Sequence, residues 1–245
     1  MREPDGKRGL AGAMENGENR LEPALFATLF KGAQRDRLPA GQVIFQQDDQ
    51  ANRLYCLVSG TIEISIFSVS GRKLVVNLQT SGLIGEIATL DGGRRTAAAA
   101  CLSACEVLSI SRATLFSRME QHPPVAMFMI RLLCDRLRRM SADVGDLALL
   151  NIEARLAKRL IMLGQNLADH EGWIRLSQSD LAELLGATRE TINKTLKDWT
   201  RDGLVHLRRG AVRVAAPDLL SRLAVKQVHN RETIQASALR DGMKK

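Results

Sequence analysis

The sequence predicts an α+β chain in three parts: an N-terminal antiparallel β-roll of jelly-roll type, one long helix, and a C-terminal winged helix-turn-helix. Three observations lead to this prediction. Short β-branched runs separated by turn residues fill residues 40–110, and a helical apolar period continues for about forty residues from Pro123. Two short helices and a hairpin then follow toward the C-terminus.

Composition sets outer limits on these parts. The chain has 245 residues, 45% of them hydrophobic, which is enough for packed cores. A net charge of +8 favours polyanionic partners only weakly. We expect flexible tails at 1–20 and 226–245, without a signal peptide, and no apolar run reaches the roughly 20 residues that span a bilayer. The protein is therefore expected to be cytoplasmic, with no membrane partner.

The first predicted part covers residues 21–122. A short helix within 22–33 would place Leu25, Phe26, Leu29 and Phe30 on one face. Strand-like runs follow: VIF, LYCLVSGTIEISIF, KLVVNL and AAAACLSACEVLSI. The alternation of polar and apolar residues over 61–66 indicates a strand with one buried face, and Ser70-Gly71 suits a hairpin turn.

The long helix is assigned to residues 123–150. Its apolar residues are separated alternately by three and four positions, as in two helices packed along their length. A second copy of the chain is the simplest partner, so a homodimer is predicted. The alternative is a long helix that lies on its own domain. The predicted seam consists of Ile130, Leu133, Leu137, Met140, Val144 and Leu147.

Residues 151–225 form the predicted winged helix-turn-helix. Ser177 and Asp180 form a capping-box variant at the start of one helix, Gly186 ends it, and Thr188 opens the next. Two short β-runs around Arg208-Arg209-Gly210 then predict a wing with arginines at its tip. Both Arg208 and Arg209 are candidate DNA contacts.

One face of the second helix has side chains that can read base edges, because arginine, glutamate and lysine match donors and acceptors in the major groove. Ile192, Leu196 and Trp199 would face inward. The alternative is a solvated face with incidental pairs such as Glu190 with Lys194. The outward face contains Arg189, Glu190, Asn193, Lys194 and Lys197.

The remaining chemistry-bearing residues suggest neither a metal site nor an enzyme. Cys56, Cys101, Cys105 and Cys134 lack the spacing of a zinc site or a disulfide framework, so buried, reduced thiols are expected. No nucleophile, base and orienting group occur together at a recognisable spacing.

Residues 22–220 resemble the cAMP receptor protein family of bacterial transcription regulators. The resemblance rests on GEIATLDGGRRTA at 85–97, on VGDLALLNIEARLA, and on LSQSDLAELLGATRETINKTLKDW. It implies a homodimer whose affinity for double-stranded DNA is controlled by a cyclic nucleotide, cAMP first and cGMP second. RNA polymerase is a candidate partner.

The resemblance makes the stretch at 85–97, read as a loop, the site of the ribose and cyclic phosphate. It implies that Glu86 binds the ribose hydroxyl, Arg95 the phosphate charge and Thr96 a phosphate oxygen, with Gly85 and Ile87 beside them. Carboxylate, guanidinium and glycine amides are suited to those roles. Arg94 should point away from Arg95 in an extended segment. The alternative is a tight turn in which Glu86 pairs with Arg95.

Two departures from the family pattern affect this site. The resemblance places the base against Met140 and Ser141, but Met140 replaces a threonine, and a thioether donates no hydrogen bond. The identity of the base therefore stays open. Asp48 stands where the family usually has glycine in its first β-turn, which predicts a modified turn.

In the DNA-binding part, Arg189, Glu190 and Lys194 match the family's base-reading positions, which implies a palindromic site with half-sites close to TGTGA. Lysine is a point charge where arginine would be bidentate, so the base facing Lys194 should be less strictly specified. Gln178 and Thr191 are candidate phosphate contacts, and Thr188 joins them as a DNA-contacting position.

A same-scaffold regulator that senses another ligand, a redox state or a gas, or that acts without a ligand, is the alternative function. Residues 1–40 contain no cysteine, unlike the iron–sulfur branch of the superfamily. Haem ligation by His122, Cys56 or Cys134 belongs to this alternative.

Overall fold

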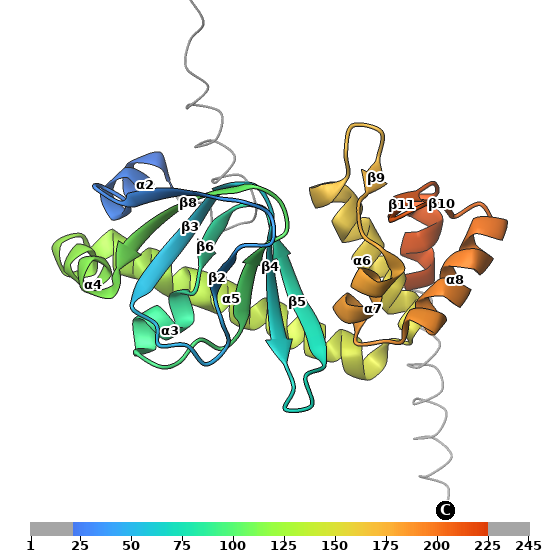
Figure 1. The fold of residues 1–245 in the computed structure, drawn as a ribbon, viewed down its shortest axis with the longest axis horizontal. Helices are drawn as coiled ribbons and strands as arrows, with labels where there is room; N and C mark the ends of the chain where they lie inside the picture. Colours follow the sequence, from blue (N-terminus) through green and yellow to red (C-terminus); the bar gives the residue numbers. More distant parts are fainter. Residues whose placement is uncertain (1–21, 225–245) are drawn as a thin grey trace, which may run out of the picture. The chain divides into compact units, whose positions relative to one another are not determined.

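A computed structural model describes residues 22–224 of the chain, so the two predicted tails lie outside the described residues (Figure 1). It divides into two compact units, Met1–Arg138 and Arg139–Lys245, which are treated separately below. The predicted fold class is confirmed: antiparallel sheets, a long helix and a helix-turn-helix follow one another. Between residues 22 and 224, no helix is both long and apolar enough to span a membrane.

The β-roll of the first unit consists of two four-stranded antiparallel sheets, ordered β1-β8-β3-β6 and β2-β7-β4-β5. Apolar side chains from both sheets form its core, with Leu57, Ile62 and Ile84 almost fully buried. The predicted hairpin turn joins β4 to β5, where Gly71 has φ +77°. The strands are β1 Gln34–Leu38, β2 Val43–Phe45, β3 Arg53–Ser59, β4 Ile62–Phe67, β5 Lys73–Gln79, β6 Gly82–Ile84, β7 Ala98–Cys101 and β8 Cys105–Ser111.

The helices of this unit are α2 Pro23–Leu29, α3 Glu86–Asp91, α4 Arg112–Gln121 and the first part of α5 Pro123–Leu149. A second apolar cluster joins α2, α4 and α5 to the strands, through Phe26, Leu54, Leu115 and Met129 among others. The start of α5 packs against the roll through this cluster, because Val125, Phe128 and Met129 are buried in it.

The structure corrects the prediction in two places within the first unit. Residues 86–91 form the short helix α3 instead of a loop, since Thr89 Oγ donates back to the Gly85 carbonyl and Glu86 suits a helix N-terminus. Strand β1 was also missed, because its sequence QRDRL is polar and its pairing comes from distant β8.

The second unit begins within α5, at Arg139. Helix α5 ends at Leu149, and Asn151 caps α6 Ile152–Leu167 by accepting from the Ala154 N–H. Then come β9 Trp173–Ile174, α7 Gln178–Leu185, α8 Arg189–Arg201, β10 Val205–Arg208 and β11 Ala211–Val214. Residues 217–224 are helical at the end of the described chain.

The helix-turn-helix and its wing form as predicted. Ser177 and Asp180 make a complete capping box, Gly186 ends α7, and Thr188 caps α8. Strands β10 and β11 pair as the wing. Strand β9 was not predicted, and it adds a third strand beside β11.

The turn at Asp48 generates a stability prediction, because Asp48 has φ +68° and is the only non-glycine residue with positive φ between 22 and 224. Asp48→Gly should raise the free energy of unfolding by about 0.5 kcal/mol, since relief of the left-handed strain exceeds glycine's entropic cost. Urea denaturation measures the change.

Asp49→Gly is the matched control. Asp49 Oδ2 accepts from the Gln46 N–H at 2.8 Å, so losing it should lower the free energy of unfolding by about 1 kcal/mol. Destabilisation by Asp48→Gly would show that the aspartate side chain stabilises this turn.

Candidate functional site

The site is built where β6 meets α3, at Gly85. This residue has φ +76° and precedes the first residue of α3. A Cβ added there would lie 2.2 Å from Nη1 of Arg95, so both the backbone and the space require glycine. Its carbonyl oxygen accepts from Arg95 Nη1 at 2.7 Å and from Thr89 Oγ1 at 2.8 Å. Gly85 therefore joins the start of α3 to the guanidinium.

Arg95 is a buried cation with neutral partners. Only 3% of it is exposed, its Nη2 donates to the Arg53 carbonyl at 2.7 Å, and its guanidinium lies 4.1 Å from the centre of the Phe45 ring. No carboxylate in residues 22–224 forms an ion pair with it, and its Nε has no hydrogen-bond partner there. Burial lowers the pKa of Arg95, with partial compensation from Tyr55, Glu86 and Asp49.

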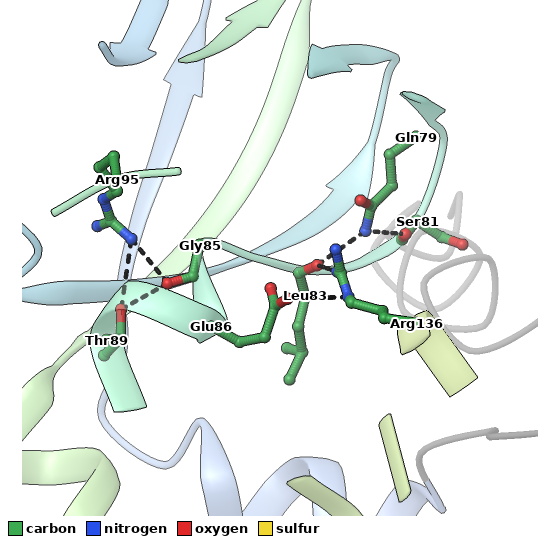
Figure 2. Close-up of polar contacts among 8 residues, drawn as sticks. All are labelled: Gln79, Ser81, Leu83, Gly85, Glu86, Thr89, Arg95 and Arg136. Carbon is green, nitrogen blue, oxygen red and sulfur yellow. Dashed lines mark hydrogen bonds and ion pairs between the residues drawn. The ribbon is translucent and has the colours of Figure 1, made fainter. Parts of the chain in front are cut away.

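Glu86 points the other way (Figure 2). Its carboxylate is 1% exposed and pairs through Oε1 with Arg136 Nε at 2.9 Å, which overturns the alternative of a Glu86–Arg95 pair. The second oxygen, Oε2, is buried without a hydrogen-bond partner in the described chain. Burial raises the pKa of Glu86, while Arg136, its own backbone N–H and Arg95 act in the opposite direction.

Arg136 is the site residue that the sequence did not reveal. It lies on α5 and also donates from Nη2 to the Leu83 carbonyl at 2.7 Å (Figure 2). The same carbonyl accepts from Gln79 Nε2 at 2.9 Å. Arg136 therefore ties α5 to both β6 and α3. A charged residue between two apolar seam positions was the only available signal, and such residues are usually solvated.

The other predicted ligand residues differ in their exposure and in the unit to which they belong. Thr96 is exposed and Ile87 is half-buried. Arg94 is exposed and donates to the Asp48 carbonyl at 2.8 Å, so it points away from buried Arg95 as predicted. Met140 and Ser141 are exposed positions on α5, within the second unit.

The predicted seam on α5 is mostly exposed in the single chain. Its exposed members range from Ile130 at 52% to Leu137 and Val144 at 65%, while Leu133 is half-buried. Exposed large apolar residues that recur along one helix face mark a surface that a partner covers. The two other exposed members are Met140 at 60% and Leu147 at 63%.

Most side chains on the outward face of α8 are exposed. Ile192, Leu196 and Trp199 are buried as predicted, and Asn193 is half-buried. Gln178 is half-buried at the first position of α7. The exposed predicted contacts on α8 and at its cap are Thr188, Arg189, Glu190, Thr191, Lys194 and Lys197.

The wing and the helix-turn-helix line an open pocket of about 250 Å³. Gln178, Arg189, Arg208 and Arg209 are among its lining residues. Arg209 is exposed at the wing turn, whereas Arg208 contacts Asp169, Glu171 and Trp173. The two wing arginines, which the sequence treats alike, therefore have different surroundings.

The thiol prediction holds for three of the four cysteines. Cys56, Cys101 and Cys105 are buried and free, but Cys134 is exposed on α5, which corrects the expectation for that residue. Burial raises the pKa of Cys56 to about 12, so its thiol stays protonated. His122 ends α4. Residues 22–224 contain no group of three or more His, Cys, Asp or Glu side chains that could hold a metal ion.

Comparisons with known proteins agree with this arrangement. Residues 35–122 match the cyclic nucleotide-binding domain model, and residues 154–223 match the Crp-like helix-turn-helix domain model. The chain is 31% identical over 210 residues to a CRP-like cAMP-activated global transcriptional regulator of Mycobacterium tuberculosis, with 83% of this chain and 94% of that protein covered. It is also 31% identical over 193 residues to the cyclic AMP receptor protein of Thermus thermophilus, covering 78% and 88%.

A solved structure gives the same result for the fold. The c-di-GMP responsive global regulator CLP of Xanthomonas campestris has a TM-score of 0.71 and 25% identity, covering 79% of this chain and 99% of that one. The two matched domain models and the length of these similarities leave one assignment. The chain belongs to the CRP-like family of cyclic-nucleotide-responsive, DNA-binding transcription regulators.

Proposed function

We propose that this chain is a homodimeric regulator that binds cAMP, and with lower preference cGMP, and then binds palindromic DNA with half-sites close to TGTGA. Residues 21–122 would bind the nucleotide, 123–150 the second copy and 151–225 the DNA. The observation that supports nucleotide binding most directly is buried Arg95, which has a full charge and no carboxylate partner in the described chain. Burying a charge without a counter-ion is costly, and an anionic phosphate would remove that cost.

The orphan atoms of the site fit the two polar parts of a cyclic nucleotide. Arg95 Nε is a buried donor without an acceptor, and phosphate oxygens are acceptors. Glu86 Oε2 is a buried acceptor without a donor, and a ribose hydroxyl is a donor. Residues 22–224 thus present one unmatched group for each half of a ribose phosphate.

A bound nucleotide could affect α5 through Arg136, which lies on this helix and pairs with Glu86. A hydroxyl on Glu86 Oε2 would share its carboxylate with the ion pair at Oε1, which fixes Arg136. The carboxylate would then be fully hydrogen-bonded and Arg136 more firmly held. Ligand binding would in this way stiffen the attachment of α5 to the roll.

The base would be recognised by residues that follow Arg136 on the same helix. Met140 and Ser141 come four and five positions later, and only the serine has a hydroxyl to offer a purine edge. Selectivity between adenine and guanine is therefore expected to be weak. Because a structural relative of 25% identity is described as c-di-GMP responsive, that dinucleotide belongs in any ligand panel.

The dimer proposal rests on the exposed apolar face of α5. Two copies of this face packed about a two-fold axis would cover Leu137, Met140 and Val144, each at least 60% exposed in the single chain. Such a dimer would present two α8 helices to successive major grooves, as palindromic sites require. RNA polymerase is expected as the further partner through which a DNA-bound regulator acts.

Calorimetric titration with cAMP, cGMP and c-di-GMP tests the ligand proposal. Arg95→Gln removes the charge and keeps a polar side chain, so cAMP affinity should fall on the order of 10- to 100-fold. Arg94→Gln is the matched control, because it removes a charge from the exposed neighbour, and it should bind like wild type. Equal losses of cAMP affinity in both variants would contradict the role of Arg95. Binding heat with c-di-GMP, but with neither cAMP nor cGMP, would identify a different effector.

Sedimentation equilibrium tests the dimer. Leu137→Glu would bury a carboxylate in each half of the seam, so the dimer dissociation constant should rise by at least about 100-fold. Arg139→Glu alters a charge on the same helix at a position outside the seam and should leave the dimer intact. A dimer that tolerates Leu137→Glu would require another interface.

Fluorescence anisotropy with a labelled TGTGA palindrome and a scrambled duplex, both with cAMP present, tests the base-reading face. Arg189→Ala should weaken binding to the palindrome by about 5- to 100-fold and leave the scrambled duplex less affected. Arg201→Ala is the control, since Arg201 pairs with Asp198 at 3.0 Å in the last turn of α8. Wild-type protein that binds both duplexes equally would overturn the TGTGA assignment.

A further inference from the structure

The two arginines at the wing differ in what holds them. Arg208 Nη2 lies 3.5 Å from Asp169 Oδ2, and its Nη1 lies 3.6 Å from Glu171 Oε2. Its guanidinium also lies 4.2 Å from the centre of the Trp173 ring. Two carboxylates and an aromatic face therefore restrain this one side chain, which is 39% exposed.

Asp169 is itself held in place by the backbone around it. Its Oδ1 accepts from the Trp173 N–H at 2.9 Å and from the Glu171 N–H at 3.1 Å. Its Oδ2 also lies 3.5 Å from Arg175 Nη2. The pKa of Asp169 is lowered, first by the Trp173 N–H, then by the Glu171 N–H and the two arginines, against partial desolvation. The carboxylate thus stays ionised into mildly acidic solution.

Arg209 follows directly and has none of these restraints. It is exposed in the turn with Gly210, and within residues 22–224 it forms no ion pair. Arg213, across the sheet, is the other cation on the Trp173 ring, at 5.1 Å from its centre. Arg208 is therefore held by contacts with the segment 169–173, whereas Arg209 is exposed and forms no ion pair within residues 22–224.

We propose that Asp169, Glu171 and Trp173 form a wing brace that holds Arg208 as a positioning residue, so that Arg209 is the wing arginine that contacts DNA phosphate. This inference rests on the proposed contact between the wing and DNA, and it separates two residues that the sequence assigned to DNA together. Moving Arg208 to a phosphate would mean leaving two carboxylates and a stacked ring. Arg209 would give up no such contacts.

The brace also explains what Arg208 contributes. Arg208 is the last residue of β10, so fixing its side chain fixes the strand end from which the turn projects. An ordered turn presents Arg209 with less loss of conformational entropy when the phosphate binds. The competing model is exchange, in which Arg208 leaves the two acids and itself takes a phosphate.

Salt dependence distinguishes the two models, because each phosphate contact that is lost reduces the slope of log K against log salt by about 0.9. The full-length wild type, Arg208→Ala, Arg209→Ala and Glu171→Gln would be titrated with the TGTGA palindrome and cAMP. A random duplex of equal length is the second probe. Asp202→Asn is the matched control for Glu171→Gln, since it removes one exposed acid from the same unit without touching Arg208.

The brace predicts that Arg209→Ala lowers the slope by about 0.9 for each wing. Arg208→Ala and Glu171→Gln should leave the slope unchanged and weaken binding by about 2- to 5-fold, through lost order in the turn. Acrylamide should quench Trp173 more strongly in both of these variants than in Asp202→Asn. Trp199, the other tryptophan, is 5% exposed and contributes little to the change.

The brace is overturned if Arg208→Ala lowers the slope and Glu171→Gln tightens binding beyond Asp202→Asn, because that is the exchange result. It is also overturned if Arg209→Ala leaves the slope unchanged on both duplexes, in which case the wing does not contact phosphate. DNA binding by the wild type would still stand in either case. Failure of the wild type to bind either duplex would instead remove the proposed function.

Discussion

A buried guanidinium that has no counter-ion among residues 22–224 is the constraint on which the nucleotide-binding domain depends. Arg95 is 3% exposed, and its hydrogen bonds within residues 22–224 all go to neutral oxygens, those of Gly85, Arg53 and Thr89. Several features serve to keep it there. Gly85 has no side chain because the guanidinium fills the space, and Phe45 stacks against the same group. Helix α3 begins at the residue after the carbonyl that Arg95 binds.

The same small region is connected to α5 through a second arginine. Glu86, the first residue of α3, uses one oxygen for Arg136 and leaves the other without a partner in the described chain. The residues proposed to bind the phosphate and the ribose are thus connected to the long helix through the start of α3 and Arg136. Together with the exposed apolar face of α5, this gives a physical reason for a ligand to affect how two chains are held. The DNA-binding unit carries its own internal order in the capped helices and the wing brace.

Local sequence signals predicted the elements whose stability is local. The capping box of Ser177 and Asp180 and the buried face of α8 depend on residues a few positions apart, so they could be identified directly. Strand β1 could not, because its polar residues become a strand only by pairing with β8.

The site residues also divide into those that local sequence could identify and those that depend on distant segments. Arg95 and Glu86 were identified through the family motif, and the opposite directions of Arg94 and Arg95 followed from strand geometry. The partner of Glu86 could not be predicted, because Arg136 lies fifty residues away on another element. The different roles of Arg208 and Arg209 depend on Asp169 and Trp173, which come before the helix-turn-helix in the chain. Contacts between distant segments are what the structure adds to the sequence.

We propose that ligand at Arg95 and Glu86 and DNA at α8 are energetically linked, and linkage of this kind must be reciprocal. The most direct measurement is the affinity for cAMP with and without saturating TGTGA palindrome, compared with the affinity for DNA with and without saturating cAMP. The two factors should be equal, on the order of 5- to 100-fold. Tight binding of both ligands with factors of one would contradict the account, because the two sites would then be independent.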